Sequence, residues 1–185
     1  MWGYKDKSAT PEFKDNLVRW TRCLPTWDRV FDRPRDLDEI FGHLPKSAAT
    51  LRRDVEAVFN LKSVDWVERS DVMRCLALRL YGGLMIDCCD VFPHECLMDC
   101  PVVAQRKIEC LRACEFVVAN GNTVNQYIEC DIVVSHAHDR RLLEVCKEMV
   151  RRLLGRRRRS RFTGPLYTVV GAWLSTGKRL GFQVS

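Results

Sequence analysis

The stretch SDVMRCLALRLYGGLMIDCCDVFP, from Ser70 to Pro93, decides the predicted fold. In its first half, apolar residues recur at helical spacing, at Val72, Cys75, Leu76 and Leu80. The two glycines at 82 and 83 then end the helix, as glycine commonly does beyond a helix C-terminus. Leu84, Met85 and Ile86 form a short apolar run that is typical of a buried strand. The stretch therefore predicts a helix, a turn and a strand.

Charged side chains lie in the predicted helix and after the predicted strand. Asp71 and Arg74 are three residues apart, so they share one face of the helix. Asp87 and Asp90 follow the strand, and open α/β sheets bind ligands beyond the carboxyl ends of their strands. These positions are therefore candidates for a ligand site. The alternative is structural, because Asp is a common turn residue and an Asp–Arg pair is commonly a solvated ion pair.

This stretch resembles the glycosyltransferases with a DXD sugar-binding motif, the family of initiating mannosyltransferases and capsular polysaccharide enzymes. The residues that carry the resemblance are Asp71, Arg74, Tyr81, Gly82, Gly83 and Asp87. Further matches extend it from Trp2 and Trp20 to the Thr163-Gly164-Pro165 turn, which is itself a specific part of the resemblance. The resemblance implies a single α/β domain over residues 1–185, with a GT-A-like mixed sheet flanked by helices and the central motif at 70–93. It also implies a chain trimmed at both ends relative to the family.

The resemblance implies that a hexose moves from a UDP- or GDP-linked donor to an acceptor, with retention of the anomeric configuration. Mn²⁺ or Mg²⁺ would stabilise the negative charge that builds on the leaving diphosphate. Such hard cations take oxygen ligands, so Asp87 and Asp90 are the expected metal ligands. Asp71 and Arg74 would hold hydroxyl groups of the donor sugar. The acceptor is a carbohydrate, a lipid or a protein.

Further donor-binding positions follow from the same resemblance. Trp2 would lie near the nucleotide base, and Gly82 and Gly83 would let backbone approach the donor closely. The expected catalytic residues are Asp87, Asp71 and Arg74.

One position departs from the family pattern. The second Asp of the motif should stand at position 89, which holds Cys89, and Asp90 follows one residue later. A local bulge would bring Asp90 to the metal in an active enzyme. Otherwise the chain is an inactive, glycosyltransferase-like binding protein, and both interpretations stay open.

Charge and cysteine content indicate two further kinds of binding. Residues 140–161 hold ten Lys or Arg and two Glu, a net charge of +8, so the rest of the chain carries −2 of the total +6. Arg151 to Arg161 is thus a candidate contact for an anionic surface or a nucleic acid, although aromatic interleaving is missing. Four of the ten cysteines are candidate ligands of a zinc ion, namely Cys96, Cys100, Cys110 and Cys114.

The sequence also bears on membranes and on compartment. No uninterrupted apolar run exceeds four residues, whereas a transmembrane helix needs about 20. The opening segment is polar and lacks the apolar core of a signal peptide. We therefore expect a cytoplasmic protein with reduced thiols.

Periodicity predicts the remaining elements of the chain. Helices are expected over 11–22, around 37–41, and over 46–61 and 140–154. Strands are expected over 27–31, 102–104 and 115–119. Residues 130–134 fit either a strand or the start of a helix.

Overall fold

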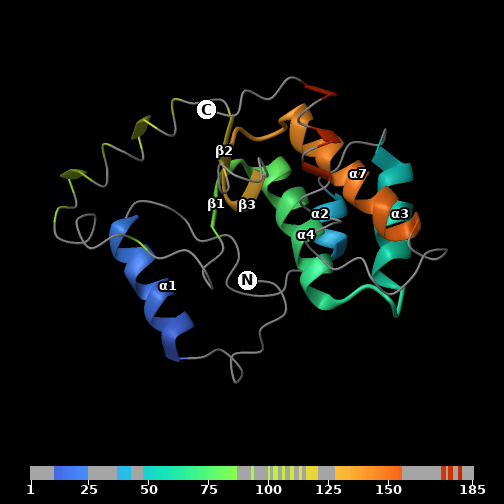
Figure 1. The fold of residues 1–185 in the computed structure, drawn as a ribbon, viewed down its shortest axis with the longest axis horizontal. Coiled ribbons are helices and arrows are strands. Elements are labelled where there is room, and N and C mark those ends of the chain that lie inside the picture. Colours follow the sequence, from blue (N-terminus) through green and yellow to red (C-terminus); the bar gives the residue numbers. More distant parts are fainter. Residues whose placement is uncertain are drawn as a thin grey trace.

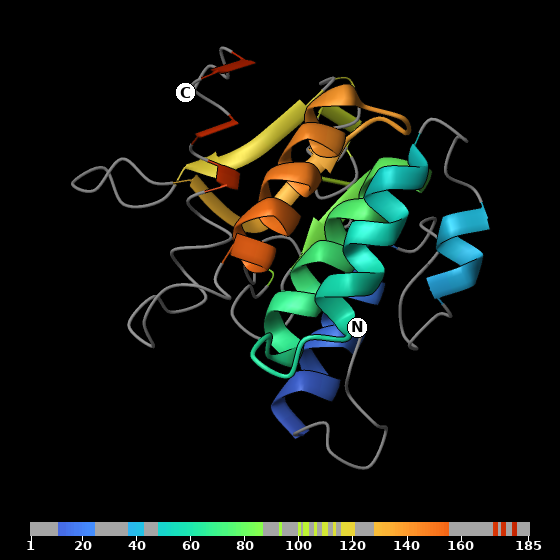
Figure 2. The ribbon, with the colours of Figure 1, turned by 90° about the vertical axis from the view of Figure 1, so that its right-hand side faces the viewer.

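The computed structural model describes residues 11–24, 37–42, 48–86, 116–120 and 128–155, with isolated positions between 93 and 113 and between 172 and 180. The elements with described bounds are α1 (Pro11–Cys23), α2 (Leu37–Gly42), α3 (Ala49–Phe59), α4 (Trp66–Tyr81), β1 (Gly83–Ile86), β2 (Phe116–Asn120), β3 (Ile128–Ser135) and α7 (Arg140–Gly155). Figure 1 shows α4 and α7 next to the sheet, with α3 on their far side. Figure 2 shows the same arrangement from the helical side.

The sheet is antiparallel, with β3 between β1 and β2. Gly83 pairs with Ser135 and Ile86 with Ile132, while β2 pairs along the other edge of β3. The predicted GT-A-like mixed sheet flanked by helices is therefore wrong, and the described chain is mostly helical. Only residues 121–127 connect β2 to β3. A connection of that length suits antiparallel neighbours, because parallel strands need a crossover of about a dozen residues or more.

Most of the predicted elements are confirmed. The structure contains the helices expected near 11–22, 37–41, 46–61 and 140–154, and residues 130–134 belong to a strand. The strand expected at 102–104 is wrong, because Val102 and Val103 are helical and exposed. A run of three apolar residues is too short to distinguish a strand from a helix. The strand expected at 27–31 lies outside the described residues.

The core forms around α4, which contacts α2, α3, α7 and β1. α4 is buried on several sides, at Val72, Met73, Cys75, Leu76, Ala77, Leu78 and Leu80. α7 instead buries one stripe, at Leu142, Val145, Cys146, Met149, Val150 and Leu153. Trp173, which is only 1% exposed, joins the same core.

Both ends of α4 have clear local causes. The Glu68 backbone N–H donates to Asp65 Oδ1 at 2.9 Å, and the Asp65 N–H donates to Glu68 Oε2 at 3.3 Å. This reciprocal capping box satisfies backbone donors at the start of the helix. At the other end, Gly82 adopts φ +66° and its N–H donates to the Leu78 carbonyl at 2.8 Å. Glycine adopts this conformation without steric cost, so the helix stops there.

Candidate functional site

The Asp71–Arg74 pair lies on α4, as the spacing predicts. Arg74 Nη2 donates to Asp71 Oδ1, forming an ion pair one helical turn apart. The side chains are 12% exposed for Asp71 and 21% exposed for Arg74. Such charges lose much of their hydration, so the pair is more than a solvated surface contact. A partly exposed carboxylate held by a guanidinium is suited to accept hydrogen bonds from a polar ligand.

The turn after α4 brings β1 back beside the helix (Figures 1 and 2). β1 contacts α4 along this return. Ile86 is the residue that precedes Asp87 in the sequence.

Gly82 permits a close backbone approach, but the approaching segment belongs to the protein itself. A Cβ at position 82 would lie 2.5 Å from the Ala137 nitrogen and 3.1 Å from the Ser135 carbonyl oxygen. The His138 N–H also donates to the Arg79 carbonyl at 2.6 Å. The glycine therefore fixes the end of α4 against the loop that joins β3 to α7, and this structural role was not anticipated from the sequence.

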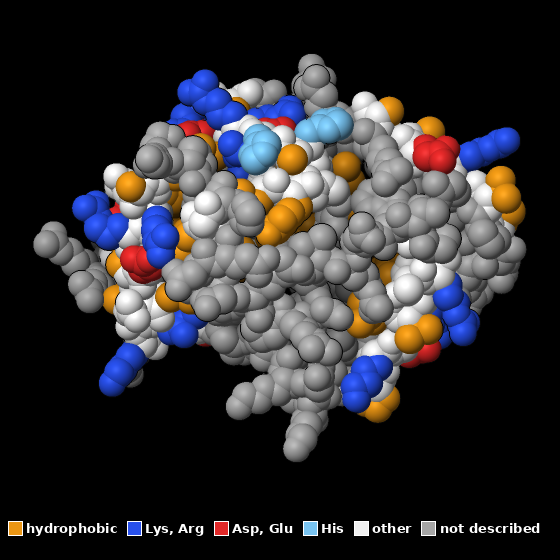
Figure 3. Space-filling model, turned by 180° about the vertical axis from the view of Figure 1, so that it is seen from behind, with side chains coloured by type: hydrophobic (Ala, Val, Ile, Leu, Met, Phe, Trp, Pro, Cys, Tyr) orange, Lys and Arg blue, Asp and Glu red, His pale blue; other side chains and the backbone are white. Residues whose placement is uncertain are grey.

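That loop carries two exposed histidines, His136 and His138. Figure 3 shows described histidine side chains on the surface, with Lys or Arg side chains nearby. His138 has φ +66°, a left-handed conformation that few residues other than glycine adopt. The backbone hydrogen bond to Arg79 accompanies this conformation.

Asp139 is a further structural residue that the sequence reasoning missed. Its Oδ1 accepts from the Arg141 N–H at 2.7 Å, which caps α7, and its Oδ2 accepts from Arg141 Nη2 at 2.6 Å. Burial acts to raise the pKa of Asp139, but the hydrogen bonds from Arg141 outweigh it and the pKa lies below its ordinary value. An Asp directly before an amphipathic helical pattern is a usual N-cap signal, so it was available in the sequence.

The other predicted site residues lie outside the described residues. These are Trp2, Asp87 and Asp90, together with the departure at Cys89. Within the described ranges, no group of three or more His, Cys, Asp or Glu side chains is arranged to hold a metal ion. The expected metal ligands, Asp87 and Asp90, are not among these described residues.

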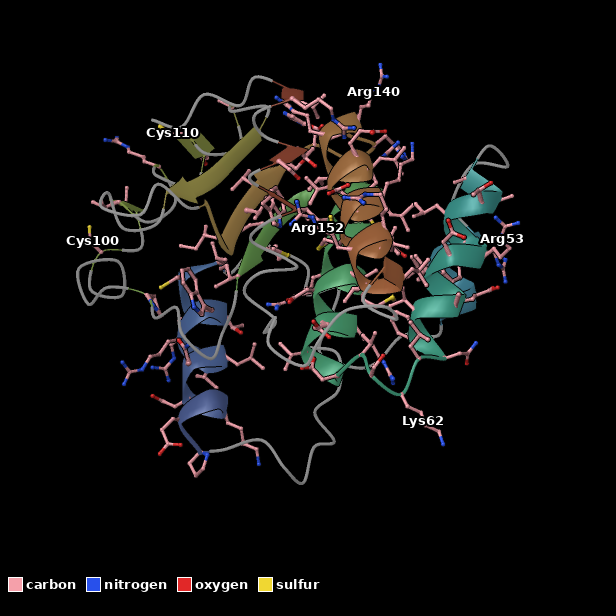
Figure 4. All side chains as sticks on the ribbon, turned by 45° about the vertical axis from the view of Figure 1, so that its right-hand side comes forward. Arg53, Lys62, Cys100, Cys110, Arg140 and Arg152 are labelled. Atoms are coloured by element: carbon pink, nitrogen blue, oxygen red, sulfur yellow. The ribbon has the colours of Figure 1, made fainter. Side chains whose placement is uncertain are left out.

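The zinc hypothesis rests on four cysteines, of which the structure describes two. Cys100 and Cys110 are exposed, and Figure 4 shows their two side chains apart from each other. Cys96 and Cys114 lie outside the described residues.

Among the described helices, none is long and apolar enough to cross a bilayer.

Comparison with protein-family models, with curated proteins and with solved structures gives no match in any of the three sets.

Proposed function

We propose that this chain is a hexosyltransferase that uses a UDP- or GDP-linked sugar as donor. The observation that supports it best is the partly buried Asp71–Arg74 pair on α4, the helix that β1 contacts. Asp87 directly follows β1 in the sequence. These residues and their order along the chain support the proposal without the predicted mixed sheet, which the antiparallel sheet of the described residues contradicts.

In the proposed reaction, Asp71 accepts hydrogen bonds from hydroxyl groups of the donor sugar. Arg74 orients this carboxylate and offsets its charge through the ion pair. Two acceptor oxygens on one fixed side chain can recognise neighbouring hydroxyls together. The pair therefore binds and positions the sugar.

Asp87 and Asp90 are the proposed ligands of Mn²⁺ or Mg²⁺. When bound, the cation would stabilise the negative charge on the departing diphosphate. One or two carboxylates together with substrate phosphates are a usual ligand set for Mg²⁺. Because Cys89 is a poor ligand for a hard cation, the proposal assigns the second carboxylate to Asp90.

A thermal-shift screen of UDP- and GDP-sugars, with and without Mn²⁺, tests donor binding first. We expect one donor to raise the unfolding temperature, and the rise to require the metal. Asp71→Asn should weaken donor binding about 10- to 100-fold, because it removes hydrogen bonds to a charged acceptor. Asp87→Ala should abolish both hydrolysis of the donor and transfer of its sugar, while the protein stays folded.

Asp54→Asn is the matched control. Asp54 is an α3 carboxylate that is 36% exposed and paired with Arg53, and its substitution should leave donor binding unchanged. Donor binding without turnover would support the inactive relative instead. Equal donor affinity in the wild type and the Asp71→Asn variant would overturn the assignment of the sugar site.

A further inference from the structure

The solvent side of α7 carries a continuous line of charged residues. Arg140, Glu144, Lys147 and Arg151 follow at intervals of four, three and four residues, so they lie along one face of the helix. Glu148 and Arg152 flank this line, and Arg179 reaches it from the C-terminal residues, donating to Glu144 Oε2 at 3.3 Å. We call these seven residues the basic strip.

Positive charge exceeds negative charge on the basic strip. Lys147 and Arg179 both bind Glu144, while Arg151 and Arg152 both bind Glu148. With Arg140, five cations share two carboxylates, which leaves a net charge of +3. Lys147, Arg151 and Arg179 side chains are 50%, 69% and 59% exposed, so this charge faces solvent. Figure 4 shows Arg140 projecting from the N-terminal end of α7.

The basic strip has a fixed orientation. The opposite face of α7 is buried in the core, and the helix contacts α3 and α4. The Arg152 guanidinium donates to Ser175 Oγ at 3.1 Å. This hydrogen bond ties Arg152, on one flank of the basic strip, to the C-terminal residues. The helix cannot turn an apolar face outward without unfolding its core. Contact through the strip is therefore electrostatic, on one exposed side of an embedded helix.

This geometry favours a broad anionic surface over a nucleic acid. Proteins that bind single strands stack bases on aromatic side chains, and the seven residues of the strip include none. A helix that reads duplex DNA must enter the major groove, whereas α7 is flanked by α3 on one side and by Ser175 and Arg179 on the other. Anionic lipid headgroups attract clustered Lys and Arg without a groove or a fixed register.

We propose that the basic strip binds the surface of membranes that contain anionic phospholipids. The surface is independent of the proposed transfer reaction, because none of its residues belongs to the Asp71–Arg74 pair. In the sequence, α7 is followed by Arg156, Arg157, Arg158 and Arg159, which add to the local excess of positive charge.

Vesicle sedimentation tests this proposal directly. The probes are phosphatidylcholine vesicles with and without about 30% phosphatidylserine, and binding should require the anionic lipid and weaken steeply between roughly 0.1 and 0.5 M salt. The test variant is Arg140→Gln/Lys147→Gln/Arg151→Gln. It leaves Arg179 on Glu144 and Arg152 on Glu148, so neither carboxylate loses its last described cation. Its affinity for the anionic vesicles should fall about 100-fold.

The matched control is Lys14→Gln/Arg53→Gln/Lys62→Gln, which removes the same charge from exposed positions outside α7. Figure 4 shows Arg53 and Lys62 projecting away from α7. The control should bind anionic vesicles within about fivefold of the wild type, because distant exposed charges are screened. An equal loss in both triple variants would overturn the proposal, and so would binding that ignores phosphatidylserine. Strip-dependent binding to duplex DNA without vesicle binding would also overturn it, in favour of nucleic acid.

Discussion

Helices α4 and α7 have the same length, 16 residues each, and pack against each other, yet they differ in where their charges lie. The Asp71–Arg74 pair on α4 is largely withdrawn from solvent in a helix buried on several sides. Most of the ion pairs of α7 lie on its outer face, opposite an unbroken apolar stripe. Their glycine ends differ in the same way. Gly82 after α4 is enclosed, whereas a Cβ at Gly155 would meet none of the described residues within 4 Å.

The charged residues of α4 and α7 therefore have different roles, one inside the protein and one on its surface. Dehydrated charges are costly unless they are paired, so the pair on α4 must be held in place by its surroundings. Exposed pairs contribute little to stability, so those on α7 leave the surface available for electrostatic contact. Substitutions on α4 should therefore lower the stability of the protein more than matched substitutions on α7.

The largest effect should come from the two glycine ends. Gly82→Ala forces a side chain into a left-handed backbone and against the Ala137 nitrogen, so we expect a loss of about 2–5 kcal/mol in the free energy of unfolding. Gly155→Ala should change it by less than about 1 kcal/mol, because no described residue lies within 4 Å of the added Cβ. Urea denaturation measures both. Comparable losses would show that the two helix ends are equally constrained.

An intermediate effect should come from breaking one ion pair on each helix. Arg74→Gln should lower the free energy of unfolding by about 1–3 kcal/mol, because it leaves Asp71 without this partner in a partly buried setting. Arg151→Gln should cost less than about 0.5 kcal/mol, because the Arg151 side chain is exposed and Glu148 keeps Arg152. Denaturant midpoints compare the two variants. If Arg151→Gln proves the more harmful, the assignment of buried and surface roles is wrong.

The smallest effect should appear only as a pH dependence. The hydrogen bond from Arg151 lowers the pKa of Glu148 from 4.5 to about 2, with further help from Arg152. A lowered folded-state pKa stabilises the protein above the unfolded value and loses that effect as the pH falls from about 4.5 towards 2. Glu148→Gln should therefore be slightly less stable than the wild type at pH 7 and should approach it near pH 2. Unfolding curves across this range test the sign, and a constant difference would contradict it.

Local features of the structure could be predicted from the sequence. The apolar spacing in 11–22, 46–61 and 140–154 identified α1, α3 and α7, because helical periodicity depends on near neighbours. The ion pair between Asp71 and Arg74 followed from a three-residue spacing alone. Both signals are contained within a few residues of the chain.

Features that join distant residues were not predictable in this way. The apolar runs of β1, β2 and β3 indicate strands, but nothing within a run fixes the direction of its neighbour. The approach of Ala137 to Gly82 and the 3.4 Å contact from Cys75 Sγ to the Leu142 carbonyl likewise depend on tertiary packing. Val102 and Val103 show a different limit, because a run of three apolar residues does not distinguish a strand from a helix.

The central position of β3 has a consequence for how the sheet opens. Val133 and Val134 pair with β1 on one side and with β2 on the other, and both side chains are buried. Releasing β3 would break both ladders together, whereas either outer strand could fray while the other pairing persists. Amide protons within β3 should therefore exchange with solvent last, and their exchange rates should report cooperative opening of the whole sheet.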